Sequence, residues 1–545
     1  MALMKKVDEL SGNPKVRSAW FKFAVAVFAI IIVIPSIFVV TKLVTDYDTV
    51  SKTIGNGAMM DLIIGAIGNS FSIAFIVTLI DIVVGLPMAW IMVRRDFKGK
   101  GFLDTLLDIP LAFPTAVLGL SVVMFWGAPD GIPIPGLGVV VTPYLMMIFL
   151  HILFTYPYMV RSLSGILEQI DPNYETAAMT LGASRWTAVR TITLPLFRAG
   201  LATGFILCFA RSLSETGGTY IALTIMGCEQ SFFTGPTFIS AAKDMFPDEY
   251  MGAMIVISVI MIVLALLMLV AVNKIIKKFK IPMKKVWPQL GRRMSRGALP
   301  KMKNGAAIAF FVLIVLVPSF YIFTYLSQPV PDVDWGTLLG SIGMSFLIAG
   351  AALVFDIVFG IPVAMYIARH RNSKKGEMLD SLVNVPLIIP TTALGFSLAM
   401  FWGSLGIGDS AAVLLCILGH ASFTYPLVVR NITGAIEEVD PSYEEVAMTL
   451  GAKPFQAFRK ILLPIVKSSV IAGGILAFTR SLGETGATLS ISSSVNTVPI
   501  YITNLVKSGN YHEAAMCSII LIIICFILMM IVRALTANKK EGRDA

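Results

Sequence analysis

Residues 154–195 read FTYPYMVRSLSGILEQIDPNYETAAMTLGASRWTAVRTITLP, and residues 423–464 repeat them as FTYPLVVRNITGAIEEVDPSYEEVAMTLGAKPFQAFRKILLP. The two stretches share 23 identical residues over 42 aligned positions, without gaps, at an offset of 269. Because self-similarity of this kind marks a duplicated structural unit, the chain is predicted to contain two copies of one module.

The similarity extends from these stretches in both directions. Upstream, IPLAFPTAVLGL at 109–120 matches VPLIIPTTALGF at 385–396, and DIVVGLPMA at 81–89 matches DIVFGIPVA at 356–364. Downstream, ARSLSETGGT at 210–219 matches TRSLGETGAT at 479–488. Because the segments keep the same order in both copies, the two modules are predicted to share one topology.

The composition predicts a membrane protein. Of the 545 residues, 56% are hydrophobic and 14% are charged, whereas soluble domains carry roughly 25% charged residues. Continuous apolar runs long enough to cross a ~30 Å hydrocarbon layer recur along the whole chain, which indicates spanning helices rather than barrel strands or a cleaved signal. We expect spans near 19–43, 68–93, 103–127, 143–163, 196–224, 251–273, 304–327, 343–368, 378–403, 410–430, 466–490 and 513–535.

Six spans in each copy give both copies the same orientation, as in parallel repeats related by an axis along the membrane normal. The predicted fold is therefore an all-α polytopic membrane protein of about 12 transmembrane helices, built from two tandem six-helix modules. The first module covers 1–273 and the second 304–545. A path between the modules is the natural place for a transported solute.

Basic residues mark one side of the membrane. Lys and Arg cluster at 5–17, 94–100, 185–190 and 369–375, in segments that the expected spans place on the same side. The positive-inside rule makes that side cytoplasmic, and both termini with it. The net charge of +10 is explained by this topology, so no nucleic-acid partner is expected.

A basic segment joins the two modules. Residues 274–303 hold eleven Lys or Arg and no acid, which predicts a cytoplasmic linker lying near anionic membrane lipid. The five cysteines fall mostly inside expected spans, without a spacing that suggests a disulfide or a metal site. We interpret them as packing residues.

A polar loop lies on the cytoplasmic side between the fourth and fifth spans of each module, at 164–195 and 433–464. In the first copy, Asp171 and Pro172 suit the start of a helix, and Gly182 suits its end, because a left-handed residue after a helix is easiest for Gly. Asp440, Pro441 and Gly451 repeat the pattern. An exposed helix, turn and helix predicts a docking element; the alternative is an ordinary loop kept similar by recent duplication.

This loop resembles the EAA loop of the permeases of binding-protein-dependent ABC importers. The residues that carry the resemblance are Ala177, Ala178, Leu181, Gly182, Ile192, Leu194 and Pro195, with Glu445, Val446, Ala447, Leu450, Gly451, Ile461, Leu463 and Pro464 in the second copy. In that family the loop forms the coupling helix, which sits in a groove of the ATPase subunit. The resemblance implies as ATPase-coupling residues Glu175, Thr176, Ala177, Ala178, Leu181, Gly182 and Ala183, and Glu444, Glu445, Val446, Ala447, Leu450, Gly451 and Ala452.

The resemblance also implies the partners and the location of the protein. A fused, double-length permease in the plasma membrane of a prokaryote would bind two copies of an ABC ATPase and an extracytoplasmic solute-binding protein. The chain contains no G-x-x-x-x-G-K-[ST] stretch, so ATP and Mg are expected on the partner, with no cofactor, no catalytic residue and no enzymatic activity here. The glutamate of the family falls at Glu445 but is replaced by Thr176 in the first copy, which predicts unequal docking sites.

Polar groups inside the expected spans are duplicated as well. A charge at mid-bilayer costs ~2.5–3.5 kcal/mol on insertion scales, so each group needs a partner or a function. One interpretation is that these residues line and gate the translocation path, and the other is that they form a buried network that holds the helices together. The histidines lack neighbouring ligands at metal spacing, so no metal site is expected. The pairs are Asp81 with Asp356, His151 with His420, Arg211 with Arg480, and Glu215 with Glu484.

The solute class follows from the resemblance. The motifs at 109–120 and 210–219, with their copies, look most like those of permeases for sulfate, molybdate and tungstate, and the RSLGET stretch is also similar to phosphate permeases. We therefore expect an inorganic oxyanion, bound weakly by this chain, with ferric iron or thiamine as the alternative. A proton-coupled secondary transporter using Asp81, Asp356 and the histidines is a different class, and a membrane enzyme would need an acid, base and nucleophile cluster that the sequence lacks.

Overall fold

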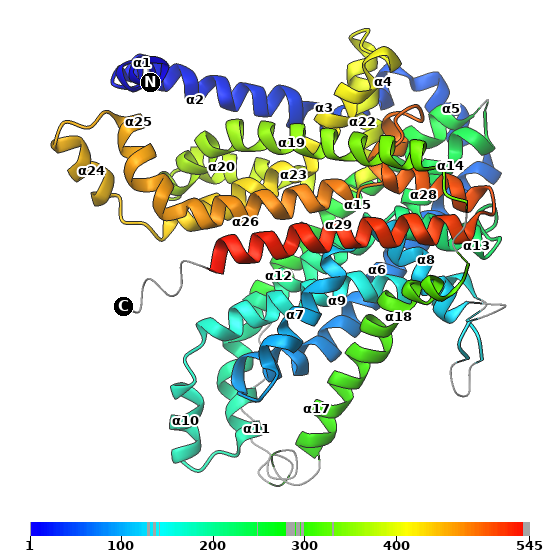
Figure 1. The fold of residues 1–545 in the computed structure, drawn as a ribbon, viewed down its shortest axis with the longest axis horizontal. Coiled ribbons are helices and arrows are strands. Elements are labelled where there is room, and N and C mark those ends of the chain that lie inside the picture. The colour runs from blue at the N-terminus through cyan, green and yellow to red at the C-terminus, as the bar shows by residue number, and fades with distance from the viewer. Residues whose placement is uncertain are drawn as a thin grey trace.

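The computed structural model describes residues 2–127, 131–133, 138–140, 142–247, 249–278, 289, 295, 299–329 and 332–537. Most of the predicted linker, 274–303, lies outside these residues. Within them the chain is helical, with one isolated bridge between Gly127 and Val140 and no strand (Figure 1). This confirms the predicted all-α fold.

The described helices account for the predicted number of spans. Nine helices are long and apolar enough to cross a membrane, and twelve spans result if three sharply bent helix pairs each count as one. The α-helices of the first half are α1 (Ala2–Ser11), α2 (Pro14–Phe28), α3 (Ile34–Ile37), α4 (Lys42–Thr45), α5 (Tyr47–Gly55), α6 (Gly57–Arg94), α7 (Lys100–Ala112), α8 (Thr115–Trp126), α9 (Pro143–Gln169), α10 (Asn173–Thr180), α11 (Arg185–Ala188), α12 (Leu194–Leu213), α13 (Gly217–Ile225), α14 (Gly235–Met245) and α15 (Tyr250–Lys278).

The second half repeats this order. Its α-helices are α17 (Leu299–Phe310), α18 (Val317–Phe320), α19 (Trp335–Arg369), α20 (Lys374–Val383), α21 (Val385–Ile388), α22 (Thr391–Ser404), α23 (Ala412–Glu437), α24 (Ser442–Thr449), α25 (Pro454–Ala457), α26 (Leu463–Leu482), α27 (Gly486–Ile491), α28 (Val498–Lys507) and α29 (Tyr511–Ala537). Short π-helical turns at Ala29–Val33, Val189–Thr193, Phe311–Leu316 and Phe458–Leu462 continue the neighbouring helices.

Two predicted spans per half are broken inside the protein. The third span bends by 103° before Thr115 in the first half, and its copy bends by 105° before Thr391. A proline lies directly before the helix that follows each bend. Because proline has no backbone N–H, it cannot donate the hydrogen bond that a continuous helix would need. The spans expected at 196–224 and 466–490 end early, at Leu213 and Leu482, and separate short helices follow. These spans are therefore bent or interrupted, where prediction drew continuous helices.

The first span of each half packs against the other half. In the N-terminal span, Phe28 stacks on Tyr425 of α23 with ring centroids 5.0 Å apart. In the first span of the second half, Phe310 lies 5.7 Å from Tyr156 of α9. Figure 1 shows α2 alongside α19, and α17 beside the helices of the first half. The sequence repeat therefore does not coincide with the packing units.

We call the first span of each half, which packs against the other half, the exchanged span. A serine of the other half hydrogen-bonds to the backbone of each exchanged span. The Ser397 hydroxyl donates to the Pro35 carbonyl at 2.6 Å and accepts the Val39 N–H at 2.9 Å. These two backbone groups are four residues apart, so the serine replaces one helical hydrogen bond. Ser121 does the same for Pro318 and Ile322 at 2.6 and 3.0 Å.

We predict that the two halves stay together when the linker is cut. A protease site inserted at 285–286 should give two fragments that co-purify in detergent, because each carries a span that the other needs. In the matched variant Ser121→Ala with Ser397→Ala, fewer fragments should co-purify, since two carbonyls and two N–H groups lose their partner. Affinity capture of one tagged fragment measures this. Separation of the fragments without the serine changes would contradict the exchange of spans.

Candidate functional site: coupling loops and central gate

The two cytoplasmic loops form the predicted helix, turn and helix. Helix α10 begins at Asn173, one residue later than predicted, and the Asp171 carboxylate accepts the Asn173 N–H at 2.9 Å. Gly182 follows the helix with φ +90°, the Ala183 N–H reaches the Ala178 carbonyl at 3.1 Å, and this closes the helix as a Schellman motif. Gly451 has φ +92° and ends α24 with the same bonds. The helix ends are confirmed at both glycines.

Most of the predicted coupling residues face away from the protein. Leu181 is 90% exposed and Leu450 is 83% exposed, although both are large and apolar. The other residues with exposed side chains or backbone are Thr176, Ala177, Gly182, Glu445, Val446 and Gly451, and the half-buried ones are Ala178, Ala183, Ala447 and Ala452. Figure 1 shows both loops projecting at the left-hand end of the molecule, with α24 near the N-terminus and α10 at the lower left.

Glu175 and Glu444 turn toward the body of the protein. Glu175 is buried, lies 3.8 Å from Arg94 and accepts the Thr193 hydroxyl at 2.7 Å. Glu444 pairs with Arg369 at 2.6 Å. These contacts fasten each coupling helix to the end of the second span. Sequence reasoning missed both arginines, although the offset of 275 that relates Asp81 to Asp356 also relates Arg94 to Arg369.

Each coupling loop also contacts the segment that precedes the first span of the other half. The Ser11 hydroxyl accepts the Phe455 N–H at 3.2 Å, and Asp8 lies 3.3 Å from Arg459. In the first loop, the Ser295 hydroxyl accepts the Trp186 N–H at 2.9 Å. No local pattern in the sequence signals these contacts, because they depend on the exchange of spans.

The charged groups of the fifth spans form two matching pairs at the breaks. Arg211 and Glu215 lie 2.8 Å apart, and Arg480 and Glu484 lie 2.5 Å apart. The second carboxylate oxygen of Glu215 accepts the Gly218 N–H at 3.0 Å, at the start of α13. Glu484 holds α27 in the same way, through the Ala487 N–H at 2.9 Å. Each glutamate therefore neutralises an arginine and satisfies a backbone group freed by the break.

The two breaks meet at the interface between the halves. A Cβ atom added to Gly217 would lie 2.4 Å from the Thr485 hydroxyl oxygen, and one on Gly486 would lie 2.5 Å from that of Thr216. The Thr391 hydroxyl lies 3.4 Å from the Ser214 carbonyl. Glycine at these positions lets the two turns touch. The two halves are therefore in close contact at this level.

The predicted path histidines lie behind these turns. His151 is buried, and its two ring nitrogens contact Ser212 of α12 at 2.7 Å and Thr219 of α13 at 3.0 Å. His420 makes the matching contacts to Ser481 and Thr488 at 2.7 and 2.9 Å. Each histidine bridges the two helices on either side of a break. These contacts suit a histidine that fixes the angle between the two helices.

The predicted aspartates connect the second and fourth spans. Asp81 of α6 is fully buried and lies 2.6 Å from the Thr155 hydroxyl, which also reaches the His151 carbonyl at 2.7 Å. Asp356 and Thr424 repeat these distances. The network interpretation thus accounts for the contacts of the aspartates and histidines, and the Arg–Glu pairs lie where the halves meet. Among the described residues, no group of three acids, histidines or cysteines is placed to hold a metal ion.

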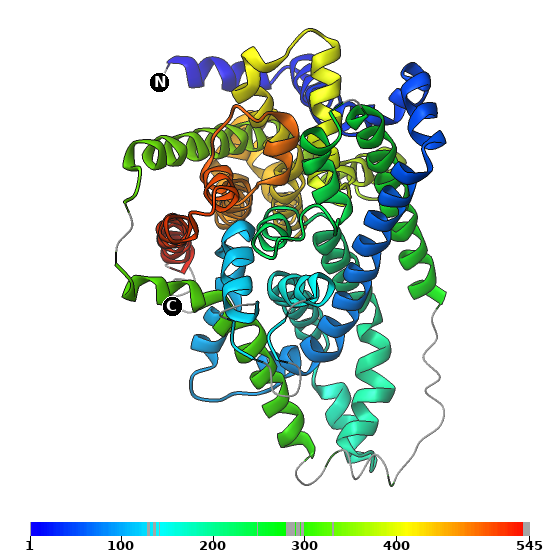
Figure 2. The same ribbon diagram turned by 90° about the vertical axis from the view of Figure 1, so that its right-hand side faces the viewer.

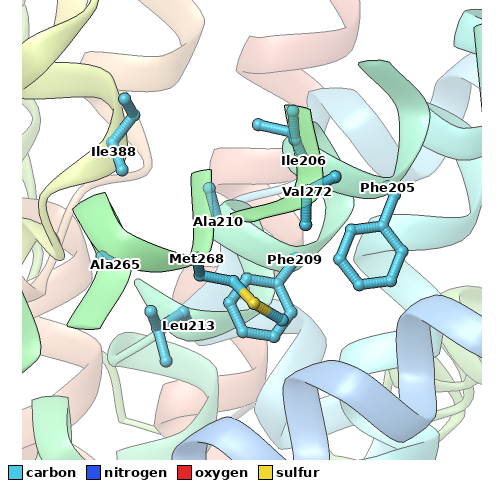
Figure 3. A pocket seen from close by; sticks show the side chains of 9 residues that line it. All are labelled: Phe205, Ile206, Phe209, Ala210, Leu213, Ala265, Met268, Val272 and Ile388. Atoms are coloured by element: carbon cyan, nitrogen blue, oxygen red, sulfur yellow. The ribbon is translucent and has the colours of Figure 1, made fainter. Parts of the chain in front are cut away.

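An apolar pocket lies against the fifth span (Figure 3). Its walls come from Phe205, Ile206, Phe209, Ala210 and Leu213 of α12, Ala265, Met268 and Val272 of α15, and Ile388 of α21. The cavity holds about 10 Å³, and a buried water needs roughly this much together with polar partners. It is not a site for a charged solute.

The fold and these loops define a class of protein, and comparison with known proteins gives the same class. The chain belongs to the family of binding-protein-dependent transport system inner membrane components, whose model matches residues 81–281 and again 360–540. It is thus a fused, double-length permease of ABC importers.

Relatives of this chain are single-length permeases. The sulfate transport system permease protein CysT of Salmonella typhimurium is 32% identical over 268 residues, which cover 46% of this chain and 96% of the relative. The molybdenum transport system permease protein ModB of Escherichia coli is 33% identical over 226 residues, covering 38% of this chain and 96% of the relative. Each relative therefore corresponds to about half of this chain.

We predict that the buried threonines stabilise the helix network. Thr155→Val with Thr424→Val leaves Asp81 and Asp356 without their hydroxyl partners, which costs about 1–3 kcal/mol per unsatisfied buried group. The melting temperature of the purified protein in detergent should fall. Thr155→Ser with Thr424→Ser keeps both hydroxyls and should melt close to the parent. Equal melting of the valine and serine variants would contradict a hydrogen-bonded network.

Proposed function

We propose that this chain forms the translocation path of an ATP-driven importer and docks two ATPase subunits through its two coupling loops. The exposed leucines of α10 and α24 support this most strongly, because two large apolar side chains stand free at one end of the protein. Exposed apolar surface on a soluble segment marks a protein contact. The ATPases would carry ATP and Mg, and this chain would transmit their motion.

The two docking sites would be unequal. Glu445 on the second coupling helix is exposed, whereas the equivalent position of the first helix carries Thr176. A basic residue on the ATPase could therefore pair with only one loop. Glu175 and Glu444, which face the protein body, would instead pass movement of the loops to the second spans through Arg94 and Arg369. Since those spans end at these arginines, a shift of the loops would tilt them.

The paired breaks are the proposed gate. They close the interface between the halves, and Arg211 and Arg480 lie beside them, with 14% and 18% of their side chains exposed. Separation of the halves would expose both guanidinium groups while their glutamates stay bound to backbone N–H groups. An anion passing the gate would then lie close to two cations, which would attract it weakly and transiently.

The proposed solute is an inorganic oxyanion such as sulfate or molybdate. The names of the relatives and the arginines at the gate support this class. Strong binding would belong to a separate extracytoplasmic protein that delivers the solute. Both termini and the coupling loops would face the cytoplasm, as the basic clusters predict. Tungstate and phosphate belong to the same class of solute, and ferric iron and thiamine are the alternatives against which the proposal is tested.

We predict that the coupling loops transmit the ATP-driven movement. Gly182→Trp with Gly451→Trp places a bulky residue at two exposed, left-handed positions, so uptake into reconstituted vesicles should fall at least about tenfold while insertion stays normal. Gly182→Asn with Gly451→Asn is the matched control, because Asn tolerates a positive φ. Unchanged uptake by the tryptophan variant would exclude coupling through these loops.

We predict two ATPase subunits for each permease chain. Capture of the tagged chain from detergent-solubilised native membranes, followed by mass spectrometry of the intact complex, measures this ratio. A binding protein recovered with the complex should bind sulfate, molybdate or a related oxyanion in calorimetry. Two permease chains per complex, or solute uptake driven by a proton gradient without ATP, would contradict the proposal.

A further inference from the structure

Helices α14 and α28 are equivalent elements of the two halves. Both begin after a threonine and carry proline at their second position, Pro236 and Pro499. Their first N–H groups donate to equivalent serines, Gly235 to Ser70 at 2.7 Å and Val498 to Ser345 at 2.9 Å. The offset of 263 between the prolines is also the offset between Asp244 and Lys507. These two residues therefore occupy the same position in the two copies.

Each of these helices reaches across to the opposite half. Helix α14 contacts α22 and α27, and α28 contacts α8 and α13. Figure 1 shows α14 and α28 at the end away from the coupling loops, and Figure 2 views the molecule from that end. They lie next to the short helices α13 and α27 that follow the proposed gate. If the halves separate at this end, α14 and α28 must move apart.

The equivalent residues meet each other. The Lys507 ammonium lies 3.7 Å from the Asp244 carboxylate and 5.2 Å from the centre of the Tyr220 ring. A contact between equivalent positions lies at the pseudo-twofold axis that relates the halves. In a permease made of two identical chains, a residue at this position would meet its own copy, and a charge there would repel. The fused chain places opposite charges at this position.

The ion pair borders a cavity that is lined mostly by the first half, with Lys507 contributed by the second half. The cavity has a volume of about 470 Å³, and its lining includes Tyr220, Thr224, Glu229 and Gln230 as well as Asp244 and Lys507. Among the described residues that line the cavity, Lys507 is the only cation. We propose that Asp244 and Lys507 form a gating pair, which holds the halves together at the outer end and must break before the halves can separate there to admit a solute. The assignment of this end as outer rests on the proposed function.

The strength of the pair follows from its exposure. The side chain of Lys507 is 40% exposed and that of Asp244 is 71% exposed. Solvent and salt therefore screen the attraction, and an exposed ion pair shifts an equilibrium only a few-fold. A gating pair of this strength lowers the population of the open form without preventing it from opening. It suits a site that a binding protein opens on docking.

Labelling of a native cysteine tests the gating pair. Cys228 is half-exposed and adjoins Glu229 of the cavity lining, whereas the other four cysteines are buried. A water-soluble maleimide should label Cys228 of the purified permease roughly two- to fivefold faster in Asp244→Asn and in Lys507→Gln than in the parent. The charge swap Asp244→Lys with Lys507→Asp should return labelling to the parental rate. Raising the salt to 0.5 M should accelerate labelling of the parent more than of Lys507→Gln.

Lys243→Gln is the matched control, because it removes an exposed positive charge one residue from Asp244. It should label at the parental rate. Parental labelling of both single variants, or a charge swap that labels as fast as they do, would overturn the gating pair. The assay uses neither ATPase nor solute, so its result is separate from that of the uptake experiments.

Discussion

One serine hydroxyl in each half replaces a backbone hydrogen bond in a helix of the other half. Inside a bilayer, an unsatisfied carbonyl or N–H costs several kcal/mol, because no water can replace the missing partner. Ser397 bridges Pro35 and Val39, so the first span satisfies these two backbone groups only when the second half is in place. The dependence is mutual, since Ser121 does the same for the second half. This exchange explains why the leading segment of one half reaches the coupling loop of the other.

The same requirement shapes the proposed gate. A spanning helix that stops at mid-membrane frees backbone groups, and Glu215 and Glu484 satisfy the N–H groups at the restart. Because these glutamates also pair with arginines, two charges per half are buried at moderate cost. The histidines fasten the helices on both sides of each break. In the proposed gate each half contributes one turn, and opening would change the contact between the halves rather than the turns themselves.

Fusion of the two modules allows differences that a symmetric dimer cannot have. The two loops differ by Thr176 in one and Glu445 in the other, and Asp244 and Lys507 place opposite charges at one position of the repeat. The first difference lies on the surface that we propose to dock the ATPases, and the second lies where the two halves meet. The buried networks, in contrast, are nearly identical in the two copies, because a change on one side of a tightly packed contact inside the membrane leaves a polar group without its partner.

The sequence by itself determined the duplication, the all-α membrane fold, the family and the helix, turn and helix of each coupling loop, because these depend on contiguous hydrophobic runs, basic clusters and cap residues such as Gly182 and Gly451. Only the tertiary structure decided which half each first span joins, where the fifth spans break, and that Glu175 faces inward to Arg94. Lipid supplies no hydrophobic preference between helices, so their pairing depends on shape and on hydrogen bonds between distant residues, such as Ser397 and Pro35, which no local pattern encodes.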